Sequence, residues 1–311
     1  MSRISTRQGF GDGMMQLVNE RDDILMVAAD TYRSFALGDF VKTYPDRYFE
    51  FGIAEQNMLD ASAGLVADGE DIVFAVGYSP FLSLRALEQI RTFVAYPGLN
   101  VKVVAGLSGL SGDSDGVTHQ GTEDLGIIRS IPKITLVCPA DYVATKKYVK
   151  IAAETPGAFY LRIGRSATDI VYDENQDFTL GKAIVTRDYG TDAVVIACGP
   201  SVGNAVLAAE ALKEKGINIR VIDAHSLKPF DEEAVLNAVR DSGKIITVED
   251  GTIYGGLGSA VAEVLAEKSD RCVNFRRLGL TTFGTAGELD ELFKFFGIGP
   301  KDIVDAVEAI M

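Results

Sequence analysis

The strongest constraint on the fold is a regular alternation of short apolar runs with amphipathic stretches along the chain. In the first half, each apolar run is four to six residues long and is followed by a stretch with helical periodicity. This order predicts βαβ units, and therefore a mostly parallel sheet with helices on both faces. The expected strands are Ile24–Ala29, Ile72–Val76, Val101–Gly106, Ile134–Cys138 and Phe159–Arg162, and the expected helices are Arg7–Asn19, Glu55–Asp68, Leu84–Ala95, Thr122–Ile128 and Tyr142–Glu154.

The same pattern restarts after a polar, acidic stretch at Ser166–Phe178, which is typical of a connector. A chain of 311 residues is long enough for two domains with sizeable cores. We therefore predict two α/β domains, residues 1–172 and 190–311, joined by a linker at 173–189. In the second domain the expected strands are Ala193–Cys198, Asn218–Asp223 and Lys244–Glu249, and the expected helices are Gly203–Lys215, Asp231–Ala238 and Gly258–Glu267.

The net charge of −14, from 30 basic and 44 acidic residues, argues against non-specific binding of nucleic acid, because the phosphate backbone would be repelled. A small anionic substrate remains compatible, since a few arginines can set the field inside a cleft. No apolar run approaches the roughly 18–20 residues of a membrane helix. Met1–Phe10 lacks an apolar signal core, so the expected location is the cytoplasm, away from membranes.

Cysteine and histidine usage limits the redox and metal chemistry of the chain. The three cysteines are far apart, and Cys138 and Cys198 lie in apolar runs, which predicts buried reduced thiols. Two histidines, His119 and His225, cannot build a His-rich metal site. His225 is most simply a structural residue at a strand end.

Phe51–Asn57, Phe-Gly-Ile-Ala-Glu-Gln-Asn, leads into an Ala/Gly-rich amphipathic segment at Met58–Gly69. Glu55 then lies on the first turn of a half-buried helix. Desolvation favours the protonated form of a carboxyl, so this group could keep its proton or share it with a bound base. The alternative is an acidic residue that complements the helix dipole.

A second polar motif, Ser111–Leu125, directly follows an apolar strand, where open α/β sheets place ligands. Asp115 and His119 are four residues apart across a glycine, so both could face one cleft. A histidine beside a carboxylate can hydrogen-bond hydroxyls and pass protons near neutral pH. The alternative is a loop that caps the next helix through Thr122 or Gln120.

Four arginines are candidates for binding an anionic group: Arg7, Arg91, Arg162 and Arg165. The last two end the final strand of the first domain, where a guanidinium fork can be presented to an anion. Surface salt bridges are the alternative for each of them.

In Tyr78-Ser-Pro-Phe81-Leu, Phe81 could stack on an aromatic ring or belong to the core.

Two glycine-containing segments are weaker indications of a ligand site. Gly11-Asp12-Gly13 lies inside a helical pattern and is not followed by the asparagine of a diphosphate motif. Val248–Gly258 lacks the Gly-x-Gly-x-x-Gly order of a dinucleotide site.

Taken in order, these motifs make the chain resemble the C-terminal half of transketolase over nearly its whole length. In that family this half comprises a pyrimidine-binding domain and a C-terminal domain, while the diphosphate-binding domain is the other half. The resemblance implies one subunit of a split transketolase. The matching segments are Ser-Thr-Arg-Gln-Gly-Phe-Gly, Ala29–Ser34, Gly-Ile-Ala-Glu-Gln-Asn, Tyr-Ser-Pro-Phe…Arg-Ala-Leu-Glu-Gln-Ile-Arg, Asp-Gly-Val-Thr-His-Gln-Gly-Thr-Glu-Asp, Pro139–Asp141, Leu-Arg-Ile-Gly-Arg, Ser-Leu-Lys-Pro-Phe-Asp and Glu-Asp-Gly…Gly-Gly-Leu-Gly.

The implied activity is transfer of a two-carbon ketol unit from a ketose (phosphate) to an aldose, as in pentose phosphate metabolism. Glu55 matches the glutamate that bonds the aminopyrimidine of thiamine diphosphate and promotes its imino tautomer. Phe81 is expected to stack on the pyrimidine, with Tyr78 as the alternative, because the spacing to Arg85 is one residue off the commonest pattern. Arg85 joins them among the implied cofactor-binding residues.

For the substrate, Asp115 and His119 match residues that contact the ketose hydroxyls beside the reactive carbon. Arg7, Ser34 and Arg165 match residues that bind the terminal phosphate. The family often has a histidine eight residues before the motif aspartate, and here that position is Leu107. The distal group is therefore expected to be a phosphate or another anion, such as that of a sulfonated sugar.

The resemblance also implies partners. The Mg²⁺ ligands should come from a separate diphosphate-binding subunit, the chain alone should be inactive, and the expected assembly is a dimer of heterodimers. The C-terminal domain is expected to support the oligomer. Two other functions stay open: the beta subunit of a 2-oxo-acid dehydrogenase, which shares the two-domain plan, and a non-catalytic partner subunit without cofactor.

Overall fold

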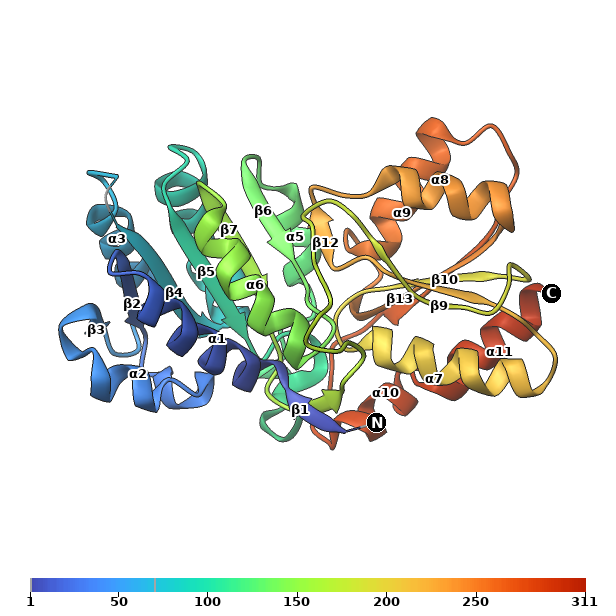
Figure 1. Ribbon diagram of the computed structural model, residues 1–311, viewed down its shortest axis with the longest axis horizontal. Coiled ribbons are helices and arrows are strands. Elements are labelled where there is room, and N and C mark those ends of the chain that lie inside the picture. The colour runs from blue at the N-terminus through green and yellow to red at the C-terminus, as the bar shows by residue number, and fades with distance from the viewer. Residues whose placement is uncertain (1, 70) are drawn as a thin grey trace.

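Two open sheets organise the chain, and helices cover both faces of each sheet (Figure 1). The structure, a computed structural model, describes residues 2–69 and 71–311. One sheet has seven strands in the order β12-β6-β7-β5-β4-β2-β3, and the other has five in the order β14-β13-β10-β11-β9. The predicted fold class, two α/β units with mostly parallel sheets, is confirmed.

The seven-stranded sheet carries the first half of the chain. Its central strands are buried along almost their whole length, as expected for a parallel sheet covered on both sides. The parallel strands are β2 (Ile24–Ala28), β3 (Tyr48–Glu50), β4 (Ile72–Tyr78), β5 (Val101–Gly106), β6 (Ile134–Val137) and β7 (Ala158–Arg162). The helical elements are α1 (Thr6–Glu20), η1 (Tyr32–Phe35), α2 (Gly38–Thr43), η2 (Pro45–Arg47), α3 (Glu55–Leu65), η3 (Phe81–Arg85), α4 (Leu87–Gln89), η4 (Ile90–Ala95), η5 (Gly109–Asp115), η6 (Val117–His119), α5 (Asp124–Ser130) and α6 (Tyr142–Glu154).

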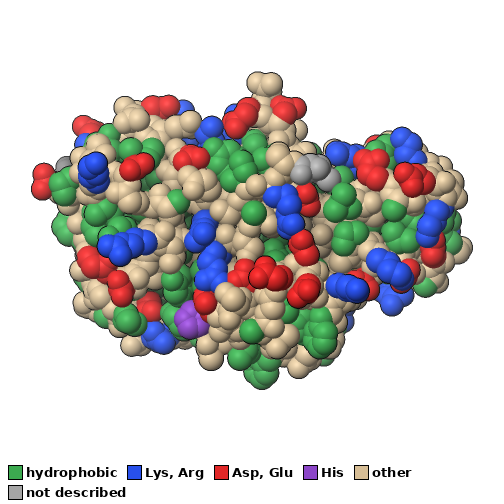
Figure 2. All heavy atoms as spheres, turned by 90° about the horizontal axis from the view of Figure 1, so that it is seen from below, with side chains coloured by type: hydrophobic (Ala, Val, Ile, Leu, Met, Phe, Trp, Pro, Cys, Tyr) green, Lys and Arg blue, Asp and Glu red, His purple; other side chains and the backbone are tan. Residues whose placement is uncertain are grey.

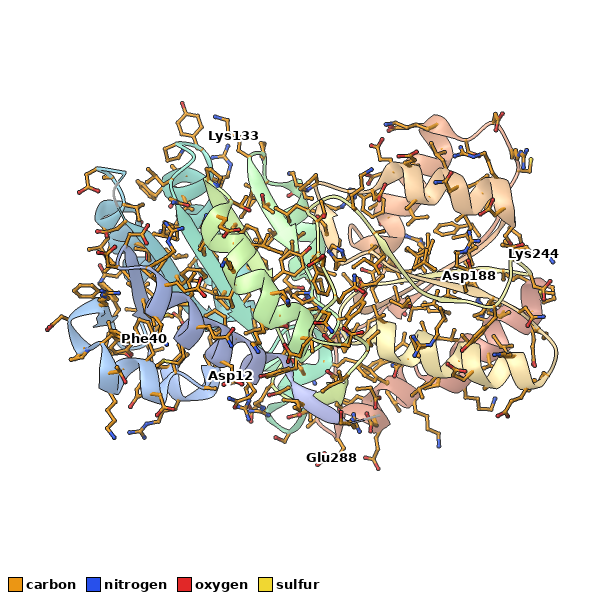
Figure 3. The ribbon with its side chains drawn as sticks, in the orientation of Figure 1. Asp12, Phe40, Lys133, Asp188, Lys244 and Glu288 are labelled. Atoms are coloured by element: carbon orange, nitrogen blue, oxygen red, sulfur yellow. The ribbon has the colours of Figure 1, made fainter. Side chains whose placement is uncertain are left out.

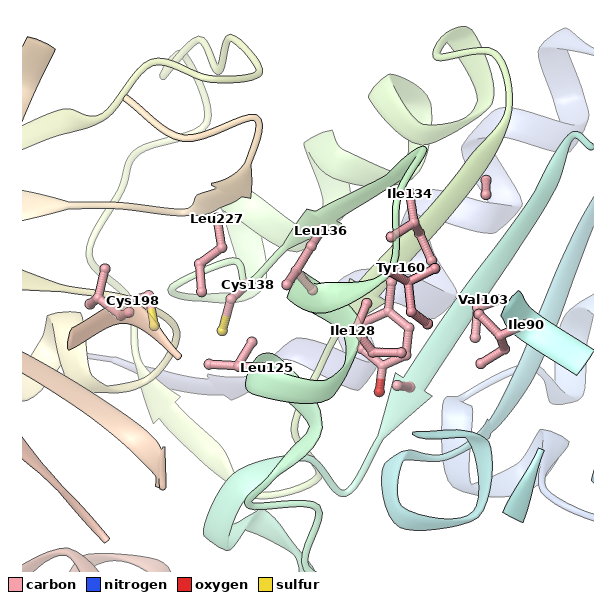
Figure 4. Packing of buried hydrophobic residues seen from close by; sticks show 14 of the residues in the cluster. Ile90, Val103, Leu125, Ile128, Ile134, Leu136, Cys138, Tyr160, Cys198 and Leu227 are labelled. Carbon is pink, nitrogen blue, oxygen red and sulfur yellow. The ribbon is translucent and has the colours of Figure 1, made fainter. Parts of the chain in front are cut away.

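Alternate residues of the central strands pack into two separate cores, because successive side chains of a strand point to opposite faces. On β4, Phe74 and Val76 pack with α1 and α6. Val73 and Ala75 pack on the other face with α3, η4 and α5. Part of this second core, with Ile90, Val103, Ile128 and Tyr160, is drawn in Figure 4.

The five-stranded sheet carries the second half. Its strands are β9 (Ile184–Asp188), β10 (Val194–Ala197), β11 (Arg220–Asp223), β13 (Lys244–Thr252) and β14 (Asn274–Leu280), all parallel except β9. Its helices are α7 (Ser201–Glu214), α8 (Glu232–Asp241), α9 (Leu257–Lys268), α10 (Leu289–Phe295) and α11 (Pro300–Ile310). In Figure 1, α7 and α11 lie below this sheet and α8 and α9 lie above it.

Strand β9 lies inside the range 173–189, which the sequence pattern predicts to be a linker, although it pairs with β11 in the second sheet. The limits of the two domains, 1–172 and 190–311, stay a prediction.

The two halves share backbone and core. Strand β12 (Ser226–Lys228) comes from the second half but pairs antiparallel with β6 at the edge of the first sheet. Strands β1 (Arg3–Ser5) and β8 (Ala167–Asp169) form a small antiparallel pair below them. Leu125, Cys138, Cys198 and Leu227 make the apolar contact continuous between the halves (Figure 4). Cys138 and Cys198 are buried free thiols, as predicted, while Cys272 is exposed.

His225 lies in this shared core and is fully buried. Its Nδ1 shares a hydrogen bond with the Tyr148 hydroxyl, and burial lowers the pKa of the imidazole to about 4. A neutral histidine held between two elements agrees with the structural role expected for this residue.

Gly11-Asp12-Gly13 lies in the middle of α1, which packs against α6 (Figure 3). A Cβ at Gly13 would lie 2.9 Å from Val149 Cγ2, and Asp12 accepts a hydrogen bond of 2.8 Å from the Tyr142 hydroxyl. These residues therefore serve the approach of two helices.

The helix expected at Leu84–Ala95 begins earlier, at Phe81, and consists of two π-helical stretches, η3 and η4, around the short α4. Such widened turns are frequent at functional sites. Across residues 2–69 and 71–311, no helix combines the length and apolar character needed to cross a membrane.

Candidate active site

The residues singled out by sequence gather where chain segments leave the carboxyl ends of neighbouring parallel strands. Tyr78 ends β4, η5 and η6 follow β5, and Arg165 follows β7. In an open α/β sheet this edge is where ligands bind. Ser34 reaches it from η1 after β2, and Glu55 from the start of α3.

Glu55 is the first residue of α3 and is only 2% exposed. Its Oε2 accepts a hydrogen bond of 2.8 Å from Nη1 of Arg85. The Arg85 guanidinium lies 4.4 Å from the centre of the Phe81 ring. Arg85 therefore makes two contacts at once, an ion pair with a buried carboxyl and a cation–π contact with an aromatic face.

We call the space between the Glu55 carboxyl and the Phe81 ring the slot. The position of Arg85 in it indicates which ligand chemistry the slot accepts. A guanidinium is flat and carries N–H donors, as does an amino-substituted nitrogen heterocycle. The aromatic face of Phe81 and the carboxyl of Glu55 thus already bind one planar, N–H-bearing group.

The rings of Tyr78, Phe81 and His119 meet next to this slot, and together we call them the aromatic corner. The ring centres of Tyr78 and Phe81 are 5.9 Å apart, those of Phe81 and His119 5.3 Å, and those of Tyr78 and His119 5.8 Å. The two pairs with His119 are edge-to-face and the Tyr78–Phe81 pair is tilted, and such contacts fix ring orientation. Nδ1 of His119 lies 3.0 Å from Thr118 Oγ1, so the hydroxyl orients the imidazole.

Tyr78 links this corner to the basic part of the site. Its hydroxyl shares a hydrogen bond of 2.8 Å with Ser34 Oγ, and the Ser34 carbonyl accepts one of 3.4 Å from Arg7 Nη1. Burial, and then the nearby charge of Arg165, lower the pKa of Arg7. Two cations that repel each other favour an anion between or beside them.

Arg165 already holds the preceding loop. Its Nη1 donates to Asp115 Oδ2 at 2.6 Å, and its Nη2 bonds Asp113. Asp115 is therefore held by Arg165, whereas His119 packs on the aromatic corner, so the two motif residues contact different parts of the site. Sequence reasoning misses Asp113, although it lies in the same acidic motif. Basic and acidic side chains both crowd this underside of the molecule (Figure 2).

Two of the candidate arginines lie elsewhere. Arg162 is buried and pairs with Asp124 and Asp250, so it is not presented to a ligand. Arg91 lies on η4, where its Nη1 donates a 3.4 Å hydrogen bond to Thr92 Oγ1.

The capping alternative for Thr122 and Gln120 is wrong. Helix α5 begins at Asp124, and Gln120 Nε2 instead donates to the Thr285 carbonyl at 2.8 Å.

Two family models match the chain. "Transketolase, pyrimidine binding domain" matches residues 2–169, and "Transketolase, C-terminal domain" matches residues 181–303.

Curated relatives match along nearly the whole chain. One subunit of the apulose-4-phosphate transketolase of Phocaeicola vulgatus is 38% identical over 96% of this chain and 95% of its own length. A 6-deoxy-6-sulfo-D-fructose transketolase subunit of a Clostridium species is 37% identical over 98% of this chain and 94% of its own.

Among solved structures, one described as "Split gene transketolase, inactive beta4 tetramer" superposes with a TM-score of 0.89. It is 36% identical to this chain, over 99% of this chain and 98% of that one.

Proposed function

The chain belongs to the transketolase family, and we propose that it is the pyrimidine-binding subunit of a split, thiamine-diphosphate-dependent transketolase. The proposed reaction moves a two-carbon ketol unit from a ketose carrying a terminal anion to an aldose acceptor. The observation that carries this proposal is the slot of Glu55 and Phe81, which already binds a planar N–H-bearing group, in a chain matched by the pyrimidine-binding and C-terminal domains.

Glu55, Phe81, Tyr78 and Arg85 are the residues that would hold the pyrimidine of the cofactor, which would take the place of the Arg85 guanidinium against Glu55 and Phe81. The chemistry that bound thiamine diphosphate supplies is a nucleophilic carbon for the ketose carbonyl. Glu55 would hold and exchange a proton with a pyrimidine nitrogen, which its burial at the start of α3 supports. Phe81 would stack on the ring, and Tyr78 would fix Phe81 from the side.

The partner is proposed to be a diphosphate-binding subunit that also supplies the Mg²⁺ ligands, because neither matched domain is the family's diphosphate-binding domain. The expected assembly is a dimer of heterodimers. The structural relative that forms an inactive beta4 tetramer supports the expectation that this chain alone self-associates without activity.

His119 and Asp115 are proposed to contact the ketose hydroxyls, and Arg7, Ser34 and Arg165 the distal anion. Both curated relatives described above are named for sugars with such a group, one a phosphate and the other a sulfonate. Leu107, where the family often has a histidine, is buried and has no polar atom in its side chain, so this side chain is not an anion ligand.

Reconstitution tests the proposal. The chain is mixed with the diphosphate-binding subunit, thiamine diphosphate, Mg²⁺, a ketose phosphate and an aldose, and ketol transfer is measured. We expect activity in the mixture and none from either chain alone. Turnover of a 2-oxo acid instead would assign the chain to the dehydrogenase branch, and a complex indifferent to thiamine diphosphate would make it a non-catalytic partner.

Replacing Arg7 by methionine tests the anion site. Losing one hydrogen-bonded cation is expected to raise KM for the anionic ketose by about tenfold or more, with kcat changed much less. KM for a donor without the terminal anion should stay unchanged. Arg3→Met is the matched control, since Arg3 is exposed and pairs with Asp290. Equal losses with both donors would show that Arg7 is not an anion ligand.

A further inference from the structure

A buried arginine joins the two sheets. Arg162, at the end of β7, is 2% exposed and pairs with one aspartate from each half of the chain. Its Nε donates to both carboxylate oxygens of Asp124 at 3.0 Å, and its Nη1 donates to Asp250 Oδ1 at 2.6 Å. Asp124 begins α5 in the first half, and Asp250 lies on β13 in the second.

Asp124 also bonds the segment that carries the aromatic corner of the site. Its Oδ2 accepts a hydrogen bond of 2.8 Å from Ser79 Oγ, and Ser79 is the residue between Tyr78 and Pro80. The Ser79 carbonyl in turn accepts a hydrogen bond of 2.7 Å from Ser83 Oγ, within η3. Ser79 thus fixes the turn from which Tyr78 and Phe81 project.

Ser79, Asp250 and Arg162 also contact the loop that carries His119. A Cβ at Gly121 would lie 2.3 Å from Ser79 Oγ, so the loop passes directly over this hydroxyl. A Cβ at Gly109, where η5 begins, would lie 2.1 Å from Asp250 Oδ2. Arg162 Nη2 also donates to the Gly121 carbonyl at 3.4 Å.

The charges in this buried region do not balance. Arg162 faces Asp124 and Asp250, and the neighbouring Glu249 is also buried, capping α9 through the amides of Leu257 and Gly258. Burial raises the pKa of Asp250, and it raises that of Glu249 to about 7. Asp250 Oδ2 has no hydrogen-bond partner within the described residues. An interdomain bond retained at such a desolvation cost suggests a role beyond adhesion of the two halves.

We propose that Asp250, Arg162, Asp124 and Ser79 form a positioning relay through which the C-terminal domain fixes the Tyr78–Phe81 turn and the His119 loop. The C-terminal domain then does more than support the oligomer. It sets how firmly the aromatic corner is held before any ligand arrives. The consequence for the cofactor rests on the function proposed above, whereas the consequence for the turn itself does not.

Ser79→Ala removes only the hydroxyl that joins the relay to the turn, and Asp250→Asn weakens its other end. In the free chain, amide hydrogen exchange over residues 78–86 and 107–121 is expected to become about tenfold faster in Ser79→Ala, and faster also in Asp250→Asn. Over residues 78–86 both residues act through the Ser79 hydroxyl, so the double variant should exchange no faster there than Ser79→Ala alone.

In the reconstituted complex, the same variants should raise the half-saturating concentration of thiamine diphosphate by about tenfold, with kcat changed much less. The control is Glu263→Gln, which breaks a different ion pair between the halves, with Arg129, at an exposed carboxylate that bonds Arg129 and not the four relay residues. Its exchange and its cofactor affinity should equal those of the wild type.

Unchanged exchange in Ser79→Ala, an equal change in Glu263→Gln, or fully multiplicative effects of the double variant over residues 78–86 would overturn the relay. A wild-type complex that does not respond to thiamine diphosphate would refute the proposed function instead, and hydrogen exchange in the free chain would still decide on the relay. Should Asp250→Asn fail to fold, Ser79→Ala alone provides that test.

Discussion

Replacing Glu55 by glutamine is expected to lower ketol transfer by the reconstituted enzyme by about 10²–10⁴-fold, the range usual for a proton-transferring side chain. Glutamine keeps the size of the side chain but cannot hold or exchange the proton. Initial rates with saturating thiamine diphosphate and Mg²⁺ would measure the loss.

Asp60→Asn is the matched control, since Asp60 lies exposed on the same helix. It should retain wild-type activity, and both variants should fold and associate with the partner subunit. A Glu55→Gln enzyme that keeps more than about a tenth of wild-type activity would show that Glu55 is not the proton-transferring group.

Replacing Arg162 by methionine is expected to lower the free energy of unfolding by about 3–5 kcal/mol, the usual cost of breaking a buried ion pair by removing one partner. Asp124 and Asp250 would remain buried without their shared cation. Urea unfolding of the free chain, followed by circular dichroism, would measure the difference.

A control variant and a compensating triple variant test this prediction further. Glu263→Gln, at the exposed ion pair with Arg129, should cost at most about 1 kcal/mol. Combining Arg162→Met with Asp124→Leu and Asp250→Leu should recover part of the lost stability, because apolar groups replace all three charges while the Ser79 hydroxyl and the Leu125 amide lose their acceptor. If Arg162→Met were no less stable than Glu263→Gln, the buried network would not be a determinant of stability.

The sequence pattern predicts the central strands well because their burial on both faces leaves continuous apolar runs. It misses strand β14, Asn274–Leu280, since this strand is half exposed and carries two arginines, which hides its periodicity. Strands β1, β3 and β12 have only three residues each, too short for any period to show. Helix α11 has a clear apolar face and is absent from the elements that the pattern predicts.

The site is predictable as far as it rests on local motifs. Glu55, Tyr78 and Phe81 come from two motifs that the fold joins through Arg85 and the aromatic corner. What the sequence could not tell is where a long side chain points. Arg162 and Arg165 are three positions apart, yet one pairs with buried aspartates, including one 88 residues away, while the other holds the site loop.

The pairing of β12 with β6 also bears on where such a chain can be divided. A fragment that ended near residue 172 would leave the outer edge of β6 without its antiparallel neighbour, exposing unpaired amides and carbonyls to other molecules. It would also uncover the apolar surface around Leu125 and Cys138, which Leu227 helps to cover in the whole chain. A chain divided at this point is therefore expected to self-associate through the uncovered edge of β6.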